Sequence, residues 1–251
     1  MKLYIEEKGE GIPLILLHGW GMNSGVWSTI AGKLAHSYRV YLVDLPGYGL
    51  SQPSEDLSFE QTARLLADQL PCGYWLGWSL GGLLSQKVAI GYPDKVMKLI
   101  TVASSATFVE RQDWPGMKAN VLSLFAKGLE QDYRRTLERF LAIQMLGSTD
   151  AKMQIRIIKE QLASKPQPDL LMLRRGLQWL ESIDLRTQIM CIEQPWLQLF
   201  GALDSLVPKQ SAGAHQACSR AVQQIFAKAS HAPFISHSGE FVQSITKFLQ
   251  G

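Results

Sequence analysis

The first hundred residues alternate between short apolar runs and amphipathic stretches, and this alternation restricts the possible folds more than any other feature. The apolar runs, rich in β-forming residues, are residues 3–6, 14–18, 40–44, 74–78 and 98–102. The stretches with helical periodicity between them are residues 24–35, 59–69 and 80–91. The same pattern returns later, with strands at 196–200 and 222–227 and a helix at about 240–249. Apolar strands separated by helices predict an α/β fold with a mostly parallel central sheet and helices on both faces.

The segment between the two groups of strands has a different pattern. Residues 117–180 contain no convincing strand but show helical periodicity, with breaks at 147–148 and 166–168. We interpret this segment as three or four helices inserted into the α/β domain. The predicted organisation is therefore a core made of residues 1–116 and 181–251, with residues 117–180 as a helical lid.

The composition is that of an ordinary globular chain and excludes several functional classes. Of 251 residues, 46% are hydrophobic and 19% charged, and the net charge is only +3. A dedicated nucleic-acid binder needs a clear basic excess, so nucleic acid is excluded as a partner. No apolar run approaches the roughly 18 residues that cross a bilayer, and the first residues lack the pattern of a signal peptide. We expect a cytoplasmic protein that binds no membrane.

Cysteine and histidine residues give no sign of a metal site. Cys72, Cys191 and Cys218 are scattered without a CxxC pair, and the five histidines show no HxxxH or HExxH spacing. In a reducing compartment the three cysteines are most simply packing residues. We predict neither a metal nor a cofactor.

A GxSxG sequence at Gly77–Gly82 supplies the candidate nucleophile, Ser79. An apolar strand enters this sequence and a helical pattern leaves it, which is typical of a sharp turn that exposes a serine Oγ at the carboxyl end of a sheet. The N–H of Leu80, at the start of the helix, can donate to a developing oxyanion. The alternative is a glycine-rich turn whose serine only caps the helix.

A serine needs a base, and the base needs an orienting acid. On turns of this kind the acid and then the histidine follow the serine in the chain. Asp204 follows the strand at 196–200, and His231 follows the strand at 222–227. Both would lie at the same sheet edge as Ser79, so we predict Ser79, Asp204 and His231 as the catalytic residues.

Other candidates fit less well. Asp184 has no strand before it, Asp44 precedes the serine and more plausibly fixes its own loop, and His237 lies toward the last helix, where it can cap. The glycine-rich run His18–Gly21 follows a strand, and the N–H of Trp20 is a second candidate oxyanion donor. His18 itself is better placed as a structural hydrogen-bonding residue than as a catalyst.

Together these motifs resemble the α/β-hydrolase superfamily. The resemblance rests on 18–21, 44–51, 77–82, the Asp204 loop and 230–233. Within that superfamily the chain most resembles the methyl ester esterases that act on pimeloyl-acyl carrier protein in biotin synthesis, through 77–82, 138–142 and 226–237.

The resemblance implies a carboxylesterase that forms an acyl-enzyme on Ser79, with His231 as base, Asp204 as orienting acid and the N–H groups of Trp20 and Leu80 as oxyanion hole. It also implies that the acyl chain lies under the lid. The implied substrate-binding residues are Trp20, Ser79, Leu80, Phe140, Leu141, Ala142, Ile143, Gln144 and His231.

The lid is basic, which suits a carrier-protein partner. From residue 117 to 165 it has nine Lys or Arg and five Asp or Glu, a net charge of +4. Arg135 with Arg139, and Lys152 with Arg156, are spaced to share a helical face. Acyl carrier protein is acidic, so these four residues are candidate docking residues. At Lys152 the resemblance leads us to expect arginine, and lysine lacks its bidentate geometry.

Some alternatives stay open. The four basic residues can instead form a solvated face paired with Glu138 and Glu160. A general short-chain carboxylesterase or a serine C–C bond hydrolase would share the fold, whereas dehalogenases and epoxide hydrolases would need Asp in place of Ser79. A ligand-binding protein without turnover would have no need of the whole triad. We expect a monomer.

Overall fold

In a computed structural model, residues 1–54, 57–148, 150–214 and 221–251 are described. Within them the chain forms a seven-stranded sheet with the order β1-β3-β2-β4-β5-β6-β7. The antiparallel pair is β1 with β3, and the other neighbouring strands are parallel. The strands are β1 (Ile5–Lys8), β2 (Pro13–Leu17), β3 (Arg39–Val43), β4 (Gly73–Trp78), β5 (Val96–Val102), β6 (Trp196–Gly201) and β7 (Ala221–Phe226). The predicted α/β class and mostly parallel sheet are confirmed.

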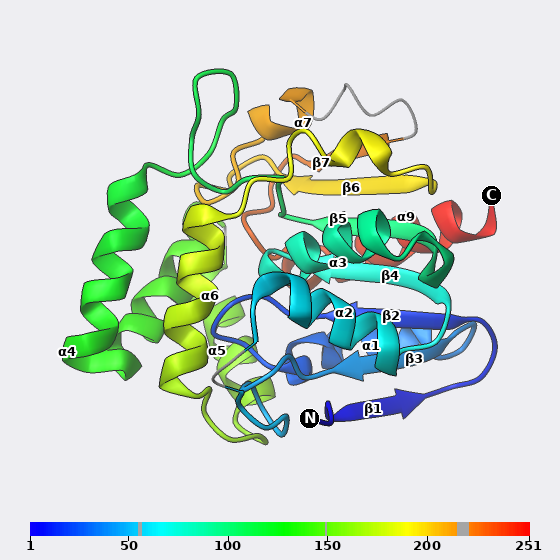
Figure 1. Ribbon diagram of the computed structural model, residues 1–251, viewed down its shortest axis with the longest axis horizontal. Coiled ribbons are helices and arrows are strands. Elements are labelled where there is room, and N and C mark those ends of the chain that lie inside the picture. Colours follow the sequence, from blue (N-terminus) through cyan, green and yellow to red (C-terminus); the bar gives the residue numbers. More distant parts are fainter. Residues whose placement is uncertain (55–56, 149, 215–220) are drawn as a thin grey trace.

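Helices cover both faces of this sheet (Figure 1). One face packs on α2 and α3, the other on α1 and α9, so that alternate residues of each central strand belong to two separate cores. The core helices are α1 (Ser28–Leu34), α2 (Phe59–Gln69), α3 (Leu80–Gly91), α7 (Gln210–Ala214), α8 (Pro233–Ser236) and α9 (Ser238–Gln250). Burial on both faces explains why the central strands are almost continuously apolar.

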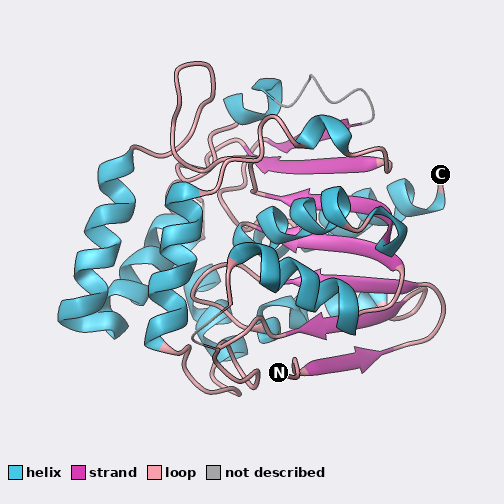
Figure 2. Ribbon diagram, in the orientation of Figure 1, coloured by secondary structure: helices cyan, strands magenta, loops and turns pink. Residues whose placement is uncertain are grey.

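Three further helices follow β5 and precede β6: α4 (Ala119–Gln144), α5 (Ala151–Leu162) and α6 (Leu170–Ser182). They lie at the sheet edge toward which the parallel strands point, seen at the left of Figure 2. The helix α4 is broken at Asp132, which has the non-helical angles φ −157° and ψ 93°. The turns after α4 and α5 fall at the two breaks of the sequence pattern. We keep the name lid for residues 117–180.

The lid is tied to core loops by hydrogen bonds. The indole N–H of Trp20 donates to the carbonyl of Leu173 at 2.8 Å, and Tyr48 donates to the carbonyl of Met172 at 3.3 Å. Because these carbonyls belong to α6, the loops that follow β2 and β3 hold this helix over the carboxyl edge of the sheet.

The structure corrects some details of the prediction. The helix expected at 24–35 begins as a 3-10 turn, Ser24–Trp27, before α1. Cys72 and Cys191 are exposed, so their interpretation as packing residues was wrong; Cys218 lies outside the described residues. No helix in the described ranges is long and apolar enough to cross a membrane.

Candidate active site

Ser79 occupies the sharp turn between β4 and α3. Its backbone has the left-handed angles φ 53° and ψ −117°, a conformation that costs a non-glycine residue about 1–3 kcal/mol. Two hydrogen bonds hold this turn: the Ser79 N–H donates to the carbonyl of Val102 at 2.9 Å, and the Ser104 hydroxyl donates to the carbonyl of Ser79 at 2.9 Å. The surrounding structure therefore fixes a strained serine at the carboxyl end of the sheet.

Glycines on both sides of Ser79 are required by close backbone contacts. A Cβ at Gly77 would lie 2.3 Å from the carbonyl oxygen of Gly81, and a Cβ at Gly81 would lie 2.4 Å from that of Leu17. Larger residues would force α3 away from β4 and β2. The GxSxG spacing is thus a packing requirement of the turn.

Asp204 and His231 form a buried hydrogen-bonded pair. His231 Nδ1 lies 2.7 Å from Asp204 Oδ2, and neither side chain is more than 1% exposed. The other oxygen, Oδ1, accepts from the N–H groups of Leu206 at 2.8 Å and Val207 at 3.1 Å. This arrangement places the proton on Nδ1 and leaves the lone pair on Nε2, as a general base requires.

The three predicted catalytic residues leave the ends of β4, β6 and β7. Trp78, which precedes Ser79, donates its indole N–H to the carbonyl of His231 at 2.8 Å, and its ring lies 5.7 Å from the imidazole. His231 Nε2 is buried and has no hydrogen-bond partner among the described residues. The nitrogen that would accept the serine proton is therefore not used by another part of the described chain.

Two backbone N–H groups near Ser79 are the candidate oxyanion donors. Leu80 is the first residue of α3, so its N–H has no acceptor within the helix. Trp20 follows Gly19, where an added Cβ would lie only 3.3 Å from the Ser79 Cβ. The loop after β2 thus lies directly beside the candidate nucleophile. The Trp20 ring packs edge-on against Phe140, with centroids 4.7 Å apart.

His18 is a buried structural residue under this loop. Its Nδ1 donates to the carbonyl of Gly19 at 2.8 Å, and its Nε2 accepts from the N–H of Leu45 at 3.0 Å. Burial lowers the pKa of His18 to about 4, although the nearby Asp44 carboxylate acts in the opposite direction. The ring is therefore neutral at pH 7 and joins the loops that follow β2 and β3.

The remaining candidates are engaged elsewhere. Asp44 is fully buried at the end of β3, where it accepts hydrogen bonds from Ser24 and Leu50. Asp184 forms an ion pair with Arg186 at 2.8 Å. His237 lies at the start of α9.

Residues 140–144 face several directions because they are consecutive on a helix. Phe140 and Gln144 are buried, whereas Ala142 and Ile143 line a cavity of about 750 Å³ between the two halves of α4. Phe125, which lines the same cavity, packs edge-on against Phe140 with centroids 5.2 Å apart. Sequence analysis did not single out Phe125; its helical spacing from other apolar residues was the available signal.

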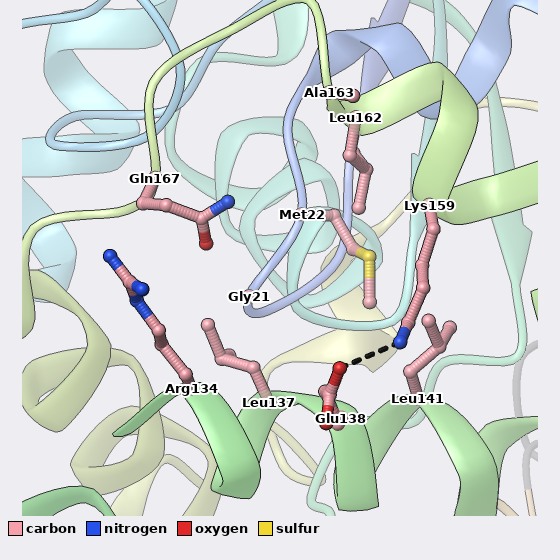
Figure 3. Close-up of a pocket in the computed structure, with 10 residues that line it drawn as sticks. All are labelled: Gly21, Met22, Arg134, Leu137, Glu138, Leu141, Lys159, Leu162, Ala163 and Gln167. Atoms are coloured by element: carbon pink, nitrogen blue, oxygen red, sulfur yellow. Dashed lines mark hydrogen bonds and ion pairs between the residues drawn. The ribbon is translucent and has the colours of Figure 1, made fainter. Parts of the chain in front are cut away.

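Leu141 faces a different cavity, shown in Figure 3. This cavity, of about 490 Å³, lies between α4, α5 and the turn at Gly21 and Met22. Lys159 and Glu138 form an ion pair of 2.7 Å at one side of it. The structure therefore does not bring all five residues from 140 to 144 to one surface.

The four candidate docking residues lie exposed on the lid. Arg135 and Arg139 lie on α4, and Lys152 and Arg156 on α5. Arg156 lies 3.7 Å from Glu160, whereas Glu138 pairs with Lys159 rather than with any of the four. Within the described ranges Arg135, Arg139 and Lys152 form no ion pair. The same ranges contain no group of three His, Cys, Asp or Glu able to hold a metal.

Comparisons with known proteins agree with this fold. The profile described as "Alpha/beta hydrolase family" matches residues 14–244. A relative from Photobacterium profundum, named pimeloyl-[acyl-carrier protein] methyl ester esterase, is 45% identical over 98% of this chain and 97% of its own. A relative of the same name from Shewanella sp. (strain MR-7) is 46% identical, with 99% and 94% covered.

Among solved structures, an esterase from Exiguobacterium antarcticum superimposes with a TM-score of 0.90 at 22% identity, covering 99% of this chain and 96% of its own. At that identity the likeness concerns the fold alone. The match to the family profile and the identity to full-length relatives lead to one conclusion: this chain belongs to the alpha/beta hydrolase family, and within it to the group whose members are named pimeloyl-[acyl-carrier protein] methyl ester esterases.

Proposed function

We propose that this chain is a serine carboxylesterase that hydrolyses the methyl ester of pimeloyl-acyl carrier protein, releasing methanol. The observation that carries the chemistry is the buried Asp204–His231 pair, whose free Nε2 lies at the same sheet edge as the strained Ser79 turn. The substrate follows from the name shared by relatives that cover nearly the whole chain.

In the acylation step, His231 Nε2 takes the proton of Ser79 as the oxygen attacks the distal ester carbonyl. The N–H groups of Trp20 and Leu80 stabilise the oxyanion, and Asp204 stabilises the imidazolium that forms. The C–O bond to the methoxy group then breaks, and the His231 proton leaves with methanol. The acyl chain stays as an ester on Ser79. A water molecule completes the cycle with the same groups.

The lid supports the proposed substrate in two ways. The cavity between the halves of α4 is lined by Phe125, Ala142 and Ile143, which suit an aliphatic chain, and Arg139 lies at the same cavity. Arg135 and Lys152 are exposed without ion-pair partners in the described chain, so they are available to an acidic carrier protein. We propose that the four docking residues steer that partner toward the cavity.

The test compares a tethered with a free substrate. We would measure kcat/KM for pimeloyl-carrier-protein methyl ester and for free monomethyl pimelate at low and high salt, with Ser79→Ala as the blank. A preference for the tethered ester that declines with salt supports the proposal. Equal rates on both substrates would instead indicate a general short-chain carboxylesterase.

A second measurement separates the chemistry from the substrate. An organophosphonate should label Ser79 stoichiometrically and should not label Ser79→Ala. Absence of labelling would refute the acyl-enzyme and would favour a ligand-binding protein. Turnover of a ring-opened dienoic acid faster than of a methyl ester would indicate a C–C bond hydrolase.

The proposed enzyme acts as a cytoplasmic monomer.

A further inference from the structure

Gln144 is a buried side chain whose polar atoms have no partner. It is fully buried at the end of α4, and neither Oε1 nor Nε2 makes a hydrogen bond with the described residues. Among the buried glutamines of the described residues, it is the one whose amide is unpartnered at both ends. A buried polar group without partners costs about 1–3 kcal/mol, so such a group indicates a water or ligand contact.

The surroundings of Gln144 belong to the candidate active site. Its backbone carbonyl accepts the N–H of His231 at 3.0 Å. One turn earlier on the same helix, Phe140 packs against Trp20, the proposed oxyanion donor. The buried face of α4 thus touches two catalytic loops, and the next turn of that face carries an unpartnered amide. His231 Nε2 is likewise buried and unpartnered.

We infer that Gln144 holds the hydrolytic water in the second half of the reaction, a role that rests on the proposed acyl-enzyme. Acylation already has a nucleophile, a base and two oxyanion donors. Deacylation needs one further molecule, a water at His231 Nε2. By microscopic reversibility, that water occupies the place vacated by the methoxy oxygen.

The balanced step is as follows. The water oxygen forms a bond to the acyl carbon while one of its protons passes to His231 Nε2, and Gln144 Oε1 accepts a hydrogen bond from the other O–H. The bond from carbon to Ser79 Oγ then breaks, and the His231 proton passes to that oxygen. The products are the free acid and the starting enzyme. Methanol has a methyl group where water has its second hydrogen, so Gln144 favours water over methanol.

This selectivity can be measured as a product ratio. A short-chain p-nitrophenyl ester forms the acyl-enzyme, and added methanol competes with water for it, giving methyl ester or free acid. Both products come from one intermediate, so the ratio of their initial rates, measured before the methyl ester is itself hydrolysed, depends neither on the acylation rate nor on the fraction of folded protein. The substitution Gln144→Met removes the acceptor at similar size, and Gln144→Glu retains an acceptor oxygen.

We expect Gln144→Met to shift the ratio toward methyl ester by about fivefold, the effect of one hydrogen bond, and Gln144→Glu to shift it less. The matched control is Gln154→Met, which removes another buried lid amide, one bonded to Ser148; its ratio should equal that of the unsubstituted protein. An unchanged ratio in Gln144→Met, or equal shifts in Gln144→Met and Gln144→Glu, would overturn the inference while leaving the esterase intact. Absence of p-nitrophenol release by the unsubstituted protein would overturn both.

Discussion

Lys165 of the lid and Asp44 of the core are 121 positions apart in the chain, yet their side chains form a buried ion pair of 3.0 Å. The Lys165 side chain is 8% exposed and that of Asp44 is completely enclosed. Lys165 also donates to the hydroxyl of Ser24 and lies 4.5 Å above the ring of Tyr4. The pair therefore fastens the segment between α5 and α6 to the core loops beneath it.

Removing one partner of this pair should destabilise the protein strongly. In Lys165→Met the Asp44 carboxylate stays buried with only backbone donors, so we expect the free energy of unfolding to fall by about 3 kcal/mol. Lys159→Met, which removes a half-exposed cation from its pair with Glu138, should cost less than about 1 kcal/mol. Urea unfolding of both variants tests this prediction, and equal losses would contradict it.

The buried His18 should make stability depend on pH. Because burial lowers its pKa to about 4 in the folded protein, the unfolded chain, with a pKa of about 6.5, binds more protons between these values. The contribution of neutral His18 to the free energy of unfolding is complete above pH 6.5. It is lost as the pH falls toward 4, and the total loss is about 3 kcal/mol.

Urea unfolding at intervals from pH 7 to 4.5 measures this dependence, and His18→Asn should show a flatter curve in the same window. Asp44 also makes the folded protein less stable as the pH falls, but at lower pH than His18, because its pKa in the folded protein is lowered. Burial by itself raises its pKa, but His18, two backbone N–H groups and Lys165 together lower it. Parallel curves for His18→Asn and the unsubstituted protein would show that His18 does not cause the loss.

Asp204→Asn should inactivate the enzyme through the wrong histidine tautomer. The N–H groups of Leu206 and Val207 point at one carboxylate oxygen, so an asparagine would turn its own oxygen toward them and its NH₂ toward His231. Nδ1 would then have to accept, and Nε2 would carry the proton. We expect kcat to fall about 10⁴-fold.

Asp184→Asn, at a carboxylate paired with Arg186, is the matched control and should retain full activity. Steady-state kinetics with a p-nitrophenyl ester suffices for both variants. If Asp204→Asn retained a tenth of the activity, another acid would have to orient His231.

Reversing a docking charge should affect only the carrier-bound substrate. For Arg135→Glu we expect the preference for tethered over free ester to fall about tenfold at low salt and much less at high salt. Arg64→Glu, at an exposed core arginine beside Asp68, reverses the same charge away from the lid and should leave the preference unchanged. A fall that does not depend on salt would contradict electrostatic docking.

The elements around the site were predictable because local signals and tertiary packing agree. The helix α2 has the bounds that its helical periodicity predicts, and in the structure a capping box of Ser58 and Gln61 fixes its first turn. The strand β4 begins one residue before its predicted start. The agreement is this close because both faces of the strand are buried, which makes its sequence a continuous apolar run. The expectation that Asp204 and His231 would meet followed from strand ends at one sheet edge, and the structure places them 2.7 Å apart.

Other features depend on contacts that no local pattern encodes. The break in α4 has neither glycine nor proline at Asp132; it is held by the Asp132 side chain, which accepts the N–H of Arg135 at 3.0 Å. The pairing of Lys165 with Asp44 joins two distant segments. The separate directions of Leu141 and Gln144 follow only once the register of the helix against the core is fixed.

The connection between Gln144 and His231 has a consequence for recombination. Ser79 precedes the lid in the chain, and Asp204 and His231 follow it, so an exchange of residues 117–180 would leave all three candidate catalytic residues in place. The exchange would not be neutral, because the N–H of His231 takes its acceptor from the lid. A transplanted lid must present a backbone carbonyl where that of Gln144 lies. Otherwise the buried N–H of His231 has no acceptor, which destabilises the protein by about 1–3 kcal/mol. Lids can therefore be exchanged between relatives only where this one backbone contact is preserved.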